Sequence, residues 1–496
     1  MSEGSRNKTL AQLGFATHDA LETPVSGIAL DSRHVREGTL FAALPGTRTH
    51  GAAFVEYALR QGAGAILTDT AGAETARAAM DSHGQVPLIV VEDAASALAG
   101  AAALWFGAQP DVMVGVTGTN GKTSVASFTR QIWQAMGLAA INIGTTGVEG
   151  DFSAPLQHTT PDALTLHKAL ADAVGAGITH AAMEASSHGL DQKRLEGVRL
   201  MAAGFTNLSQ DHLDYHPDFE SYFDAKAGLF ERVLPDSAMA VICTDSAYGA
   251  DMAARAEQAG LPLMRVGRSP DDDLRIQALR FDADGQDVRF SWGGVTRQAR
   301  LNLIGGFQAE NVMLAAGLAI ASGSEPAQVF AVLDQLEGVR GRMQWVARRK
   351  NGASVYVDYA HTPDALATAL QALRPHVMGR LIVVFGAGGD RDTGKRPLMG
   401  AAASEHADMV FVTDDNPRSE DPADIRRQVL EGCPNATEVG DRAEAILRGV
   451  DALEGGDVLL VAGKGHETGQ IMGDQVFPFD DAEQASVAVA ALDGLL

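Results

Sequence analysis

Short apolar runs alternate with helix-length amphipathic segments along most of this chain. Near the N-terminus, helical patterns cover 52–60 and 94–106. The apolar runs around them have the length of buried strands and lie at 27–30, 40–44, 63–67 and 87–91. Strands and helices in alternation are typical of a small α/β domain.

The same alternation restarts at Asp111 and predicts a larger domain with a parallel sheet. Its expected strands lie at 112–117, 139–143, 181–184, 201–206 and 238–243. Between 274 and 303 the pattern changes to strands with turn signals at Asp284-Gly285 and Gly293-Gly294, which predicts an antiparallel patch at a sheet edge. Helices resume near Gln308.

A third set of strands follows Gly338, at 355–358, 381–385, 410–413 and 458–461. We therefore predict an α/β protein with three domains, at 1–110, 111–337 and 338–496. The length of 496 residues agrees, because domains average roughly 150 residues.

Composition narrows the possible partners and the compartment. Lys and Arg number 39 against 63 Asp and Glu, a net charge of −24 that repels nucleic acid and acidic membranes. The two cysteines, Cys243 and Cys433, form no CxxC motif, which fits a reducing compartment. The first residues lack the apolar core of a secretory signal, and the apolar stretch 94–108 is too short to cross a bilayer. We expect a cytoplasmic protein with no membrane insertion and no nucleic-acid partner.

The strongest local motif joins the apolar run 112–116 to Gly118, Gly121, Lys122 and Thr123 ahead of a helical stretch. Glycines let backbone N–H groups approach phosphate, the lysine supplies positive charge, and the threonine hydroxyl suits Mg²⁺. Val116 replaces the first glycine of the general GxxxxGK[ST] pattern. The segment still predicts a nucleotide-binding loop, and a glycine-rich turn without a ligand is the alternative.

Two further segments, 183–194 and 205–230, begin at the carboxyl ends of expected strands, where open sheets bind ligands. Glu184 and His212 are candidate metal ligands, although each type is more often structural. His212 and His216 have the spacing of a zinc pair, but no HExxH motif supports zinc hydrolysis. Lys226 lies in an aromatic-rich amphipathic helix, where spacing alone favours a solvated side chain.

The third domain carries charged loops after its strands. Segment 385–397 fails the GxGxxG pattern because Arg391 occupies the last glycine position, so a dinucleotide site is weakly supported. Two arginines and a lysine are candidate carboxylate clamps, and two acids are candidate partners for an ammonium group: Arg391, Arg418, Lys464, Asp415 and Glu467. An amino acid would satisfy both sets, and plain surface ion pairing is the equally weighted alternative.

Together these segments resemble the Mur ligase family over nearly the whole chain. The resemblance is carried by TGTNGKT at 117, MEASSHGL at 183, FTNLSQDHLDYH at 205, GRMQ at 341, VDYAHTPDAL at 357 and AGKGHE at 462. Within the family, DNPR at 415–418, preceded by GGDRDTGKRPLMG, resembles the members that add diaminopimelate. Gln308 and Gln344 depart from residues common in relatives, where Asn and Glu are frequent.

The resemblance implies an N-terminal domain for a UDP-sugar, a central P-loop ATPase domain and a C-terminal Rossmann-like domain for an amino acid. It implies an ATP-dependent amide ligase of peptidoglycan precursor synthesis, adding meso-diaminopimelate to UDP-N-acetylmuramoyl-L-alanyl-D-glutamate through an acyl phosphate. The substrates would be small molecules, the cation Mg²⁺ and the protein a monomer. Two alternatives stay open, a relative that adds L-lysine or another amino acid and a P-loop switch ATPase.

The resemblance also assigns site residues. ATP would contact Thr117, Gly118, Thr119, Asn120, Gly121, Lys122, Thr123, Asn311, Arg342 and Asp358. The UDP-muramoyl-dipeptide would contact Leu30, Ser32, Thr47, Arg48, Thr49, Thr159, Thr160, Ser186, Gln192 and Arg194. Diaminopimelate would contact Arg391, Asp415, Asn416, Pro417, Arg418, Gly463 and Glu467. Lys122, Lys226, His212 and Glu184 would be catalytic, with Mg²⁺ held by Thr123, Glu184, His212 and a carbamylated Lys226.

Overall fold

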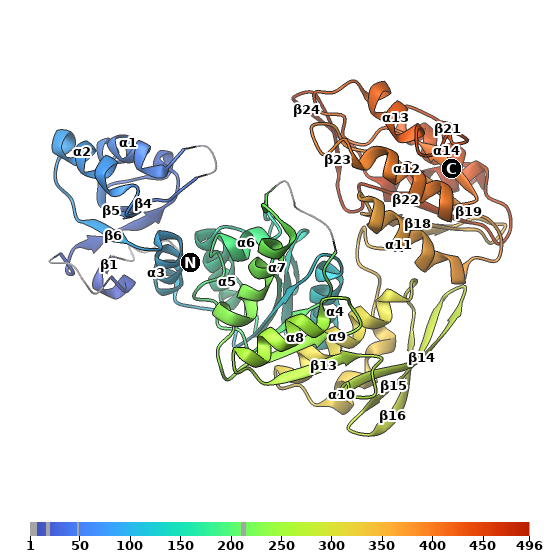
Figure 1. The fold of residues 1–496 in the computed structure, drawn as a ribbon, viewed down its shortest axis with the longest axis horizontal. Helices are drawn as coiled ribbons and strands as arrows, with labels where there is room; N and C mark the ends of the chain where they lie inside the picture. The colour runs from blue at the N-terminus through green and yellow to red at the C-terminus, as the bar shows by residue number, and fades with distance from the viewer. Residues whose placement is uncertain (1–6, 16–19, 47–48, 210–214, 496) are drawn as a thin grey trace. The chain divides into compact units, whose positions relative to one another are not determined.

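The computed structural model describes residues 7–15, 20–46, 49–209 and 215–495 (Figure 1). The chain divides into two compact units. The first contains Met1–Lys122, Gly137–Met264 and Ala321–Gly323, and the second contains Thr123–Met136, Arg265–Ile320 and Ser324–Leu496.

The first unit begins with a four-stranded parallel sheet in the order β3-β4-β5-β6. Its strands are β3 (Gly27–Ala29), β4 (Thr39–Ala43), β5 (Ala63–Asp69) and β6 (Leu88–Val91), with β1 (Lys8–Thr9) and β2 (Pro24–Val25) paired separately. Its helices are α1 (Val55–Arg60), α2 (Ala73–His83) and α3 (Ala94–Phe106), with short 3₁₀ turns at Ala11–Leu13, Ser32–His34 and Gly51–Phe54. Leu40 and Ala42 enter one apolar cluster and Phe41 the other, as side chains that alternate across a doubly covered sheet must.

The first unit continues with strands in the order β9-β8-β10-β7-β11-β12. These strands pair in parallel except for the β8–β9 hairpin. The strands are β7 (Val112–Thr117), β8 (Ala140–Gly144), β9 (Gly147–Gly150), β10 (His180–Glu184), β11 (Ala202–Phe205) and β12 (Met239–Cys243). The helices are α5 (Ala163–Gly175), α6 (Ser187–Asp191), α7 (Phe219–Gly228) and α8 (Gly249–Gln258), with a π-helical turn at Leu229–Val233.

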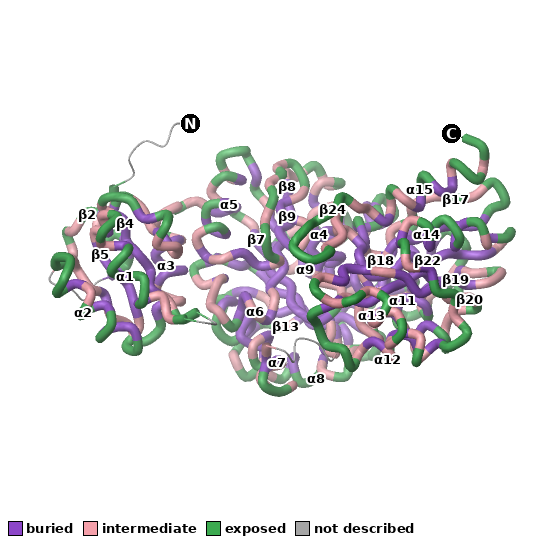
Figure 2. Tube along the Cα trace, turned by 90° about the horizontal axis from the view of Figure 1, so that it is seen from above, coloured by how far each residue is buried: buried purple, intermediate pink, exposed green. Residues whose placement is uncertain are grey.

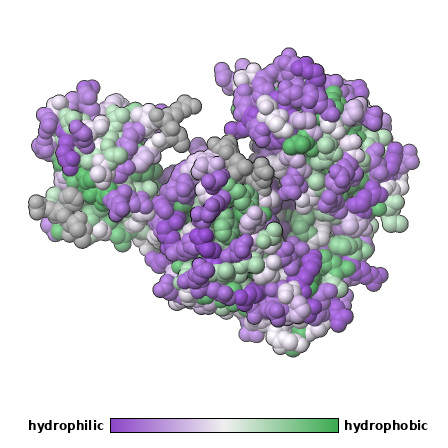
Figure 3. Space-filling model, viewed as in Figure 1, coloured by the Kyte–Doolittle hydropathy of each residue, from purple (hydrophilic) through white to green (hydrophobic). Residues whose placement is uncertain are grey.

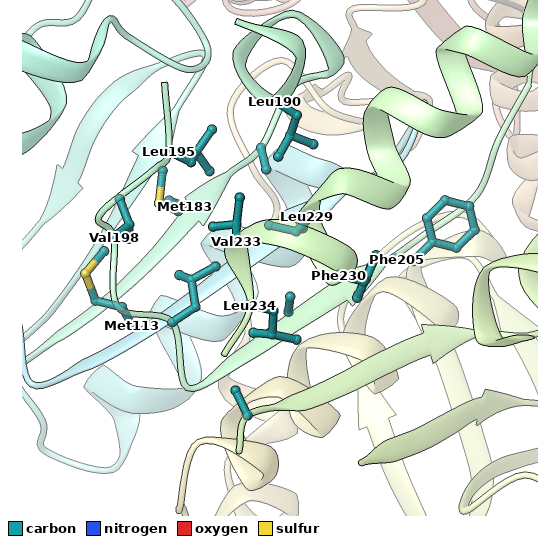
Figure 4. Packing of buried hydrophobic residues seen from close by; sticks show 14 of the residues in the cluster. Met113, Met183, Leu190, Leu195, Val198, Phe205, Leu229, Phe230, Val233 and Leu234 are labelled. Carbon is teal, nitrogen blue, oxygen red and sulfur yellow. The ribbon is translucent and has the colours of Figure 1, made fainter. Parts of the chain in front are cut away.

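Apolar side chains from strands and helices meet on one face of this sheet (Figure 4). Met113 of β7, Met183 of β10 and Phe205 of β11 pack in one cluster with Leu229 and Phe230, which follow α7. This core fixes the ends of the parallel strands, and those ends carry the candidate site.

The second unit contains α4 from its second residue onward (Lys122–Ala135) and the antiparallel strands β14 (Leu274–Asp282), β15 (Gly285–Trp292) and β16 (Val295–Leu301). Strand β13 (Leu263–Gly267) leads into them, and α9 (Phe307–Ala321) and α10 (Pro326–Ala331) follow. The predicted antiparallel patch is therefore present. The first turn lies one residue earlier than expected, because Gly285, with φ +157°, already pairs with Asp282.

The rest of the second unit is a six-stranded sheet in the order β17-β18-β22-β19-β20-β21, parallel except for β17. Its strands are β17 (Gln344–Arg348), β18 (Ser354–Asp358), β19 (Leu381–Phe385), β20 (Met409–Val412), β21 (Thr437–Glu438) and β22 (Val458–Ala462), and β23 (Gly469–Met472) and β24 (Gln475–Pro478) form a separate hairpin. Its helices are α11 (Pro363–Leu373), α12 (Lys395–His406), α13 (Pro422–Leu430), α14 (Arg442–Asp451) and α15 (Asp481–Leu492), with 3₁₀ turns at Leu333–Gln335 and Arg374–His376.

Burial follows this architecture. Figure 2 shows β7, β18 and β22 as largely buried segments, and nearly all their residues are inaccessible. On the face drawn in Figure 3, hydrophilic residues cover much of the surface and hydrophobic areas are smaller. Within the described residues, no helix combines the length and apolar character needed to span a membrane.

The predicted α/β fold class is confirmed. Helix α3 and strands β7 and β19 have the predicted bounds. The predicted helix 52–60 begins as the 3₁₀ turn Gly51–Phe54, in which His50 accepts a bond from Ala52 N. The domain boundaries near 110 and 337 remain predictions.

Candidate active site

The backbone of the glycine-rich loop between β7 and α4 accepts hydrogen bonds from the lysine of the same motif. Lys122 Nζ donates to the carbonyl oxygens of Gly118 at 2.8 Å and Thr119 at 2.7 Å. Gly118 has φ +144°, and a Cβ there would lie 1.8 Å from Thr206 Oγ1, so only glycine fits. A loop of this shape, ending at the start of the 14-residue helix α4, is suited to an anion.

Two residues that the sequence motifs left unassigned, directly after the neighbouring strand β11, hold this loop. Asn207 accepts from Asn120 N through Oδ1 at 3.0 Å and from Thr119 N through its carbonyl at 2.9 Å. Thr206 Oγ1 donates to Asn120 O at 2.6 Å. Because β11 pairs directly with β7, its carboxyl end had to lie beside the loop, which is the signal that could have identified both residues.

Glu184, the last residue of β10, is buried and its carboxylate is oriented by the end of the adjacent strand β8. Thr145 N donates to Oε1 at 2.9 Å, and Thr145 Oγ1 lies 3.3 Å from the same oxygen. Gly144 provides the space, since a Cβ there would lie 1.9 Å from Oε1. A carboxylate fixed in this way is a suitable ligand for a hard cation.

Lys226 is buried, with 1% of its surface exposed, so the spacing-based expectation of a solvated lysine was wrong. Its Nζ donates to Gly118 O at 2.8 Å and lies 4.4 Å from the centre of the Tyr222 ring. The Tyr222 hydroxyl is 3.0 Å from Thr119 Oγ1. Helix α7 therefore places Lys226 beside the phosphate loop. Lys226 lies one helical turn after the buried Tyr222, so the same face of the helix buries both side chains.

Four residues assigned to the dipeptide form one hydrogen-bonded group after β10. Arg194 donates to Gln192 Oε1 through Nε and Nη2 and to Thr160 O through Nη1 at 2.6 Å. Thr160 Oγ1 accepts from Ser186 N and donates to Glu184 O, both at 2.9 Å. Burial lowers the pKa of Arg194. The hydrogen bonds to Gln192 and Thr160 fix the position of its guanidinium group.

Of the other residues assigned to the UDP-muramoyl portion, Thr159 adjoins that group. Thr159 lies 3.1 Å from Thr145 through the two hydroxyls. Leu30 and Ser32 follow β3 on either side of Asp31, and Thr49 is exposed. Thr47, Arg48 and His212 lie outside the described residues.

The second unit contains the remaining residues assigned to ATP. Asn311 is buried in α9 and donates to Gln308 Oε1 at 3.0 Å, so the departure at 308 supplies an acceptor. Arg342 stacks on Tyr359, with 4.5 Å from its guanidinium carbon to the ring centre, and Nη2 lies 3.5 Å from Thr123 Oγ1.

Asp358, at the end of β18, is tied into the backbone of the second unit. Its carboxylate accepts from Met343 N at 2.6 Å and Ala360 N at 2.8 Å, and burial raises the pKa of its carboxyl group. The departure at 344 is accommodated here as well, since Gln344 Oε1 accepts from Gly341 N at 2.8 Å.

The DNPR segment follows β20 and lies against the loop after β22. Lys464 is fully buried and donates to Asn416 Oδ1 at 2.8 Å, and its Nζ is 3.3 Å from Asp415 Oδ1. Asn416 Nδ2 donates to Glu467 Oε2 at 2.9 Å. The alternative of surface ion pairing is therefore wrong for Lys464 and Asp415, which lie inside the protein.

A third loop, after β19, closes on the DNPR segment. Gly389 N donates to Asn416 O at 2.9 Å, and Arg418 Nη1 donates to Gly389 O at 2.7 Å. A Cβ at Gly389 would lie 1.9 Å from Pro417 O, so the contact needs glycine. Arg391, in the same loop, is exposed. Gly463, with φ +118°, donates its N–H to Asp358 O at 3.1 Å.

Backbone strain is concentrated in these motif segments. The non-glycine residues found at positive φ in the described chain are Lys193, Met343, Asp390 and Arg418. Each costs on the order of 1–3 kcal/mol and persists only where surrounding contacts hold it. At Arg418 the contacts are backbone bonds to β23 and to the turn after it, Arg418 N to Ile471 O at 3.1 Å and Gly473 N to Arg418 O at 2.7 Å.

Metal-binding groups are sparse in the described chain, which contains no cluster of three or more His, Cys, Asp or Glu side chains placed to hold a metal. Oxygen donors suited to Mg²⁺ are nevertheless present at Glu184 and, in the second unit, at the buried hydroxyl of Thr123.

Comparison with known proteins identifies the family. Family models match three stretches: the Mur ligase family catalytic domain at 24–105, the Mur ligase middle domain at 116–319 and the Mur ligase glutamate ligase domain at 341–465. The chain is 50% identical over 471 residues to the UDP-N-acetylmuramoyl-L-alanyl-D-glutamate--2,6-diaminopimelate ligase of Bradyrhizobium diazoefficiens, covering 94% of this chain and 95% of the relative. The chain belongs to the Mur ligase family.

Other comparisons agree. This Mur ligase is 49% identical over 481 residues to the ligase of the same description from Caulobacter vibrioides, covering 96% of this chain and 97% of that one. It is also similar to a solved structure of a UDP-N-acetylmuramoyl-L-alanyl-D-glutamate--2,6-diaminopimelate ligase, with a TM-score of 0.72, 33% identity and coverage of 98% and 99%. The family resemblance predicted from the motifs is confirmed.

Proposed function

We propose that this Mur ligase is an ATP-dependent amide ligase that adds meso-diaminopimelate to UDP-N-acetylmuramoyl-L-alanyl-D-glutamate in peptidoglycan precursor synthesis. The observation that carries the proposal is its identity of about 50%, over nearly the full length, to ligases of that description. The charged residues around DNPR support it, because the partly exposed Glu467 carboxylate and the Arg418 guanidinium suit the ammonium and carboxylate groups of an amino acid.

The chemistry begins with transfer of the γ-phosphoryl group of ATP to the free D-glutamyl γ-carboxylate, which gives an acyl phosphate and ADP. The amine of diaminopimelate attacks the acyl carbon, the tetrahedral intermediate loses a proton, and phosphate leaves as the amide forms. Lys122 stabilises the charge that develops on the transferred oxygens. Thr160, Ser186, Gln192 and Arg194 hold the dipeptide.

Mg²⁺ fits the oriented carboxylate of Glu184 in the first unit. Thr123, Glu184, His212 and Lys226 are the residues proposed to hold the cation, and when bound it offsets the crowding of triphosphate and carboxylate. An ammonium on Lys226 would repel the cation, whereas a carbamate there would support it. In solution, isotopically labelled bicarbonate would add a carbamate signal to the wild-type protein that Lys226→Met lacks.

Arg418 supplies the preference for diaminopimelate over lysine. The second carboxylate of diaminopimelate would pair with the guanidinium, and lysine would leave it unpaired, at a cost on the order of 10³-fold in kcat/KM. We further propose that residues 1–110 bind the UDP-sugar, that residues 338–496 bind the amino acid, and that a monomer works in the cytoplasm.

One assay tests the proposal. Purified protein is incubated with ATP, Mg²⁺ and UDP-muramoyl-dipeptide, and diaminopimelate, lysine and D-alanyl-D-alanine are offered separately. A product of the mass of the diaminopimelate adduct is expected, and heavy oxygen placed in the acceptor carboxylate should appear in the released phosphate. A lysine adduct alone would favour the lysine-adding alternative, and ATP hydrolysis indifferent to all three would favour a switch ATPase.

A further inference from the structure

Lys464 is a fully buried lysine whose ammonium group donates hydrogen bonds to two oxygens and lies near a third. Nζ donates to Asn416 Oδ1 at 2.8 Å and to Gly469 O at 2.9 Å, and it lies 3.3 Å from Asp415 Oδ1. These oxygens come from the DNPR segment and from the start of β23. An ammonium has three donors and no acceptor, and two of the three donors of Lys464 are used in these hydrogen bonds within the protein.

This lysine determines which way the Asn416 carboxamide points. Oδ1 also accepts from Ile471 N at 3.0 Å, so two donors converge on one end of the amide and that end must be the oxygen. The amide nitrogen is thereby directed at Glu467, to which it donates at 2.9 Å. Of the three linked side chains, Glu467 is the accessible one, with 33% of its side chain exposed against none for Lys464.

We propose that Lys464 is a positioning residue for the incoming amino acid: its ammonium fixes the Asn416 carboxamide, and the carboxamide aims the Glu467 carboxylate at the ligand's ammonium group. The inference rests on the proposed function and deepens it, because it separates the residue that meets the ligand from the residues that hold it. Without Lys464, the carboxamide loses its charged donor, and a flipped amide would turn its oxygen toward the carboxylate.

The charges around this group make the effect measurable. Glu467 is faced by Asp415, Lys464 and Arg418, and Lys464 is faced in addition by Arg442 and Asp481. Burial, followed by Asp415, raises the pKa of Glu467, whereas Asn416, Lys464 and Arg418 lower it. Loss of the Lys464 charge therefore raises the pKa of Glu467 further.

The test compares Lys464→Met with wild type and with Lys350→Met. Lys350 is an exposed lysine of the same unit that bonds to Asp493, so it controls for the loss of one lysine. For Lys464→Met we expect the KM for diaminopimelate to rise roughly 10- to 100-fold, with the KM values for ATP and the UDP-dipeptide within about twofold. The acid limb of kcat/KM for diaminopimelate should move to higher pH, which a merely structural defect would not produce.

Lys464→Gln keeps an N–H donor without the charge. It should recover part of the KM, while its acid limb stays displaced, and it carries the test by itself if Lys464→Met does not fold. An unchanged KM for diaminopimelate, or an equal rise for all three substrates, would overturn the inference. Wild-type protein without diaminopimelate-dependent turnover would instead overturn the proposed function, so the two failures are distinguishable.

Discussion

Gly144 offers a direct test of Glu184, because its lack of a side chain makes room for that carboxylate. An alanine Cβ would lie 1.9 Å from Oε1 and 2.6 Å from Cδ of Glu184, whereas ordinary contacts begin at 3.4 Å. The carboxylate must therefore move by about 1.5 Å, which breaks the 2.9 Å bond from Thr145 N. Gly144 is outside the left-handed region, so the backbone accepts alanine and the effect falls on Glu184.

The size of the effect follows from the lost bond. A hydrogen bond to a charged group contributes about 1.5–3 kcal/mol, which corresponds to roughly a 10- to 150-fold change. For Gly144→Ala we expect kcat to fall by about that factor and the Mg²⁺ concentration for half-maximal rate to rise, with the KM for diaminopimelate unchanged.

Steady-state ADP release, measured as Mg²⁺ is varied, is the assay. Gly175→Ala is the matched control, because Gly175 ends α5 and a Cβ there meets nothing within 4 Å. If Gly144→Ala kept the wild-type rate and Mg²⁺ dependence, the assignment of Glu184 to the cation would be wrong.

Three further predictions concern the second unit. Arg418→Ala should raise the KM for diaminopimelate by on the order of 10³-fold and leave that for ATP unchanged, and equal effects on both would refute its assigned role. Asp481→Ala leaves the fully buried Arg442 guanidinium unpaired and should lower the free energy of unfolding in urea by about 3–5 kcal/mol, against at most ~1 kcal/mol for Arg448→Ala in an exposed pair. Burial and nearby arginines lower the pKa of His466 from 6.5 to about 4. Between pH 6.5 and about 4, the imidazole is therefore protonated in the unfolded chain but neutral in the folded protein. Stability should therefore fall as pH falls from 6.5 to about 4, by at most ~1.4 kcal/mol per pH unit, and urea titrations of His466→Gln should show a flatter dependence; an unchanged slope would contradict this.

Local sequence was sufficient for most strands and for the motifs. Strand β7, the glycines after it and Lys122 are contiguous, so periodicity and glycine placement identify the phosphate loop without any tertiary contact. The strands β1, β2 and β21 escape such prediction, because each has two residues, too few to show a periodicity.

Burial of charge was not predictable from spacing. Lys226 and Lys464 have neighbours in sequence that fit a solvated lysine equally well, yet both are buried against oxygens contributed by residues more than 40 positions away. Thr206 and Asn207 went unassigned for the same reason, since their partners belong to the loop after a different strand.

The sequence by itself therefore determined the order of strands and helices, the phosphate-binding loop and the family, because each depends on residues close together in the chain. Only the tertiary structure decided which of the charged side chains lose their water and which direction the Asn416 carboxamide takes. Those outcomes depend on donors and acceptors that the burial of apolar surface brings together from separate loops. The sequence pattern does not show which of these groups come into contact.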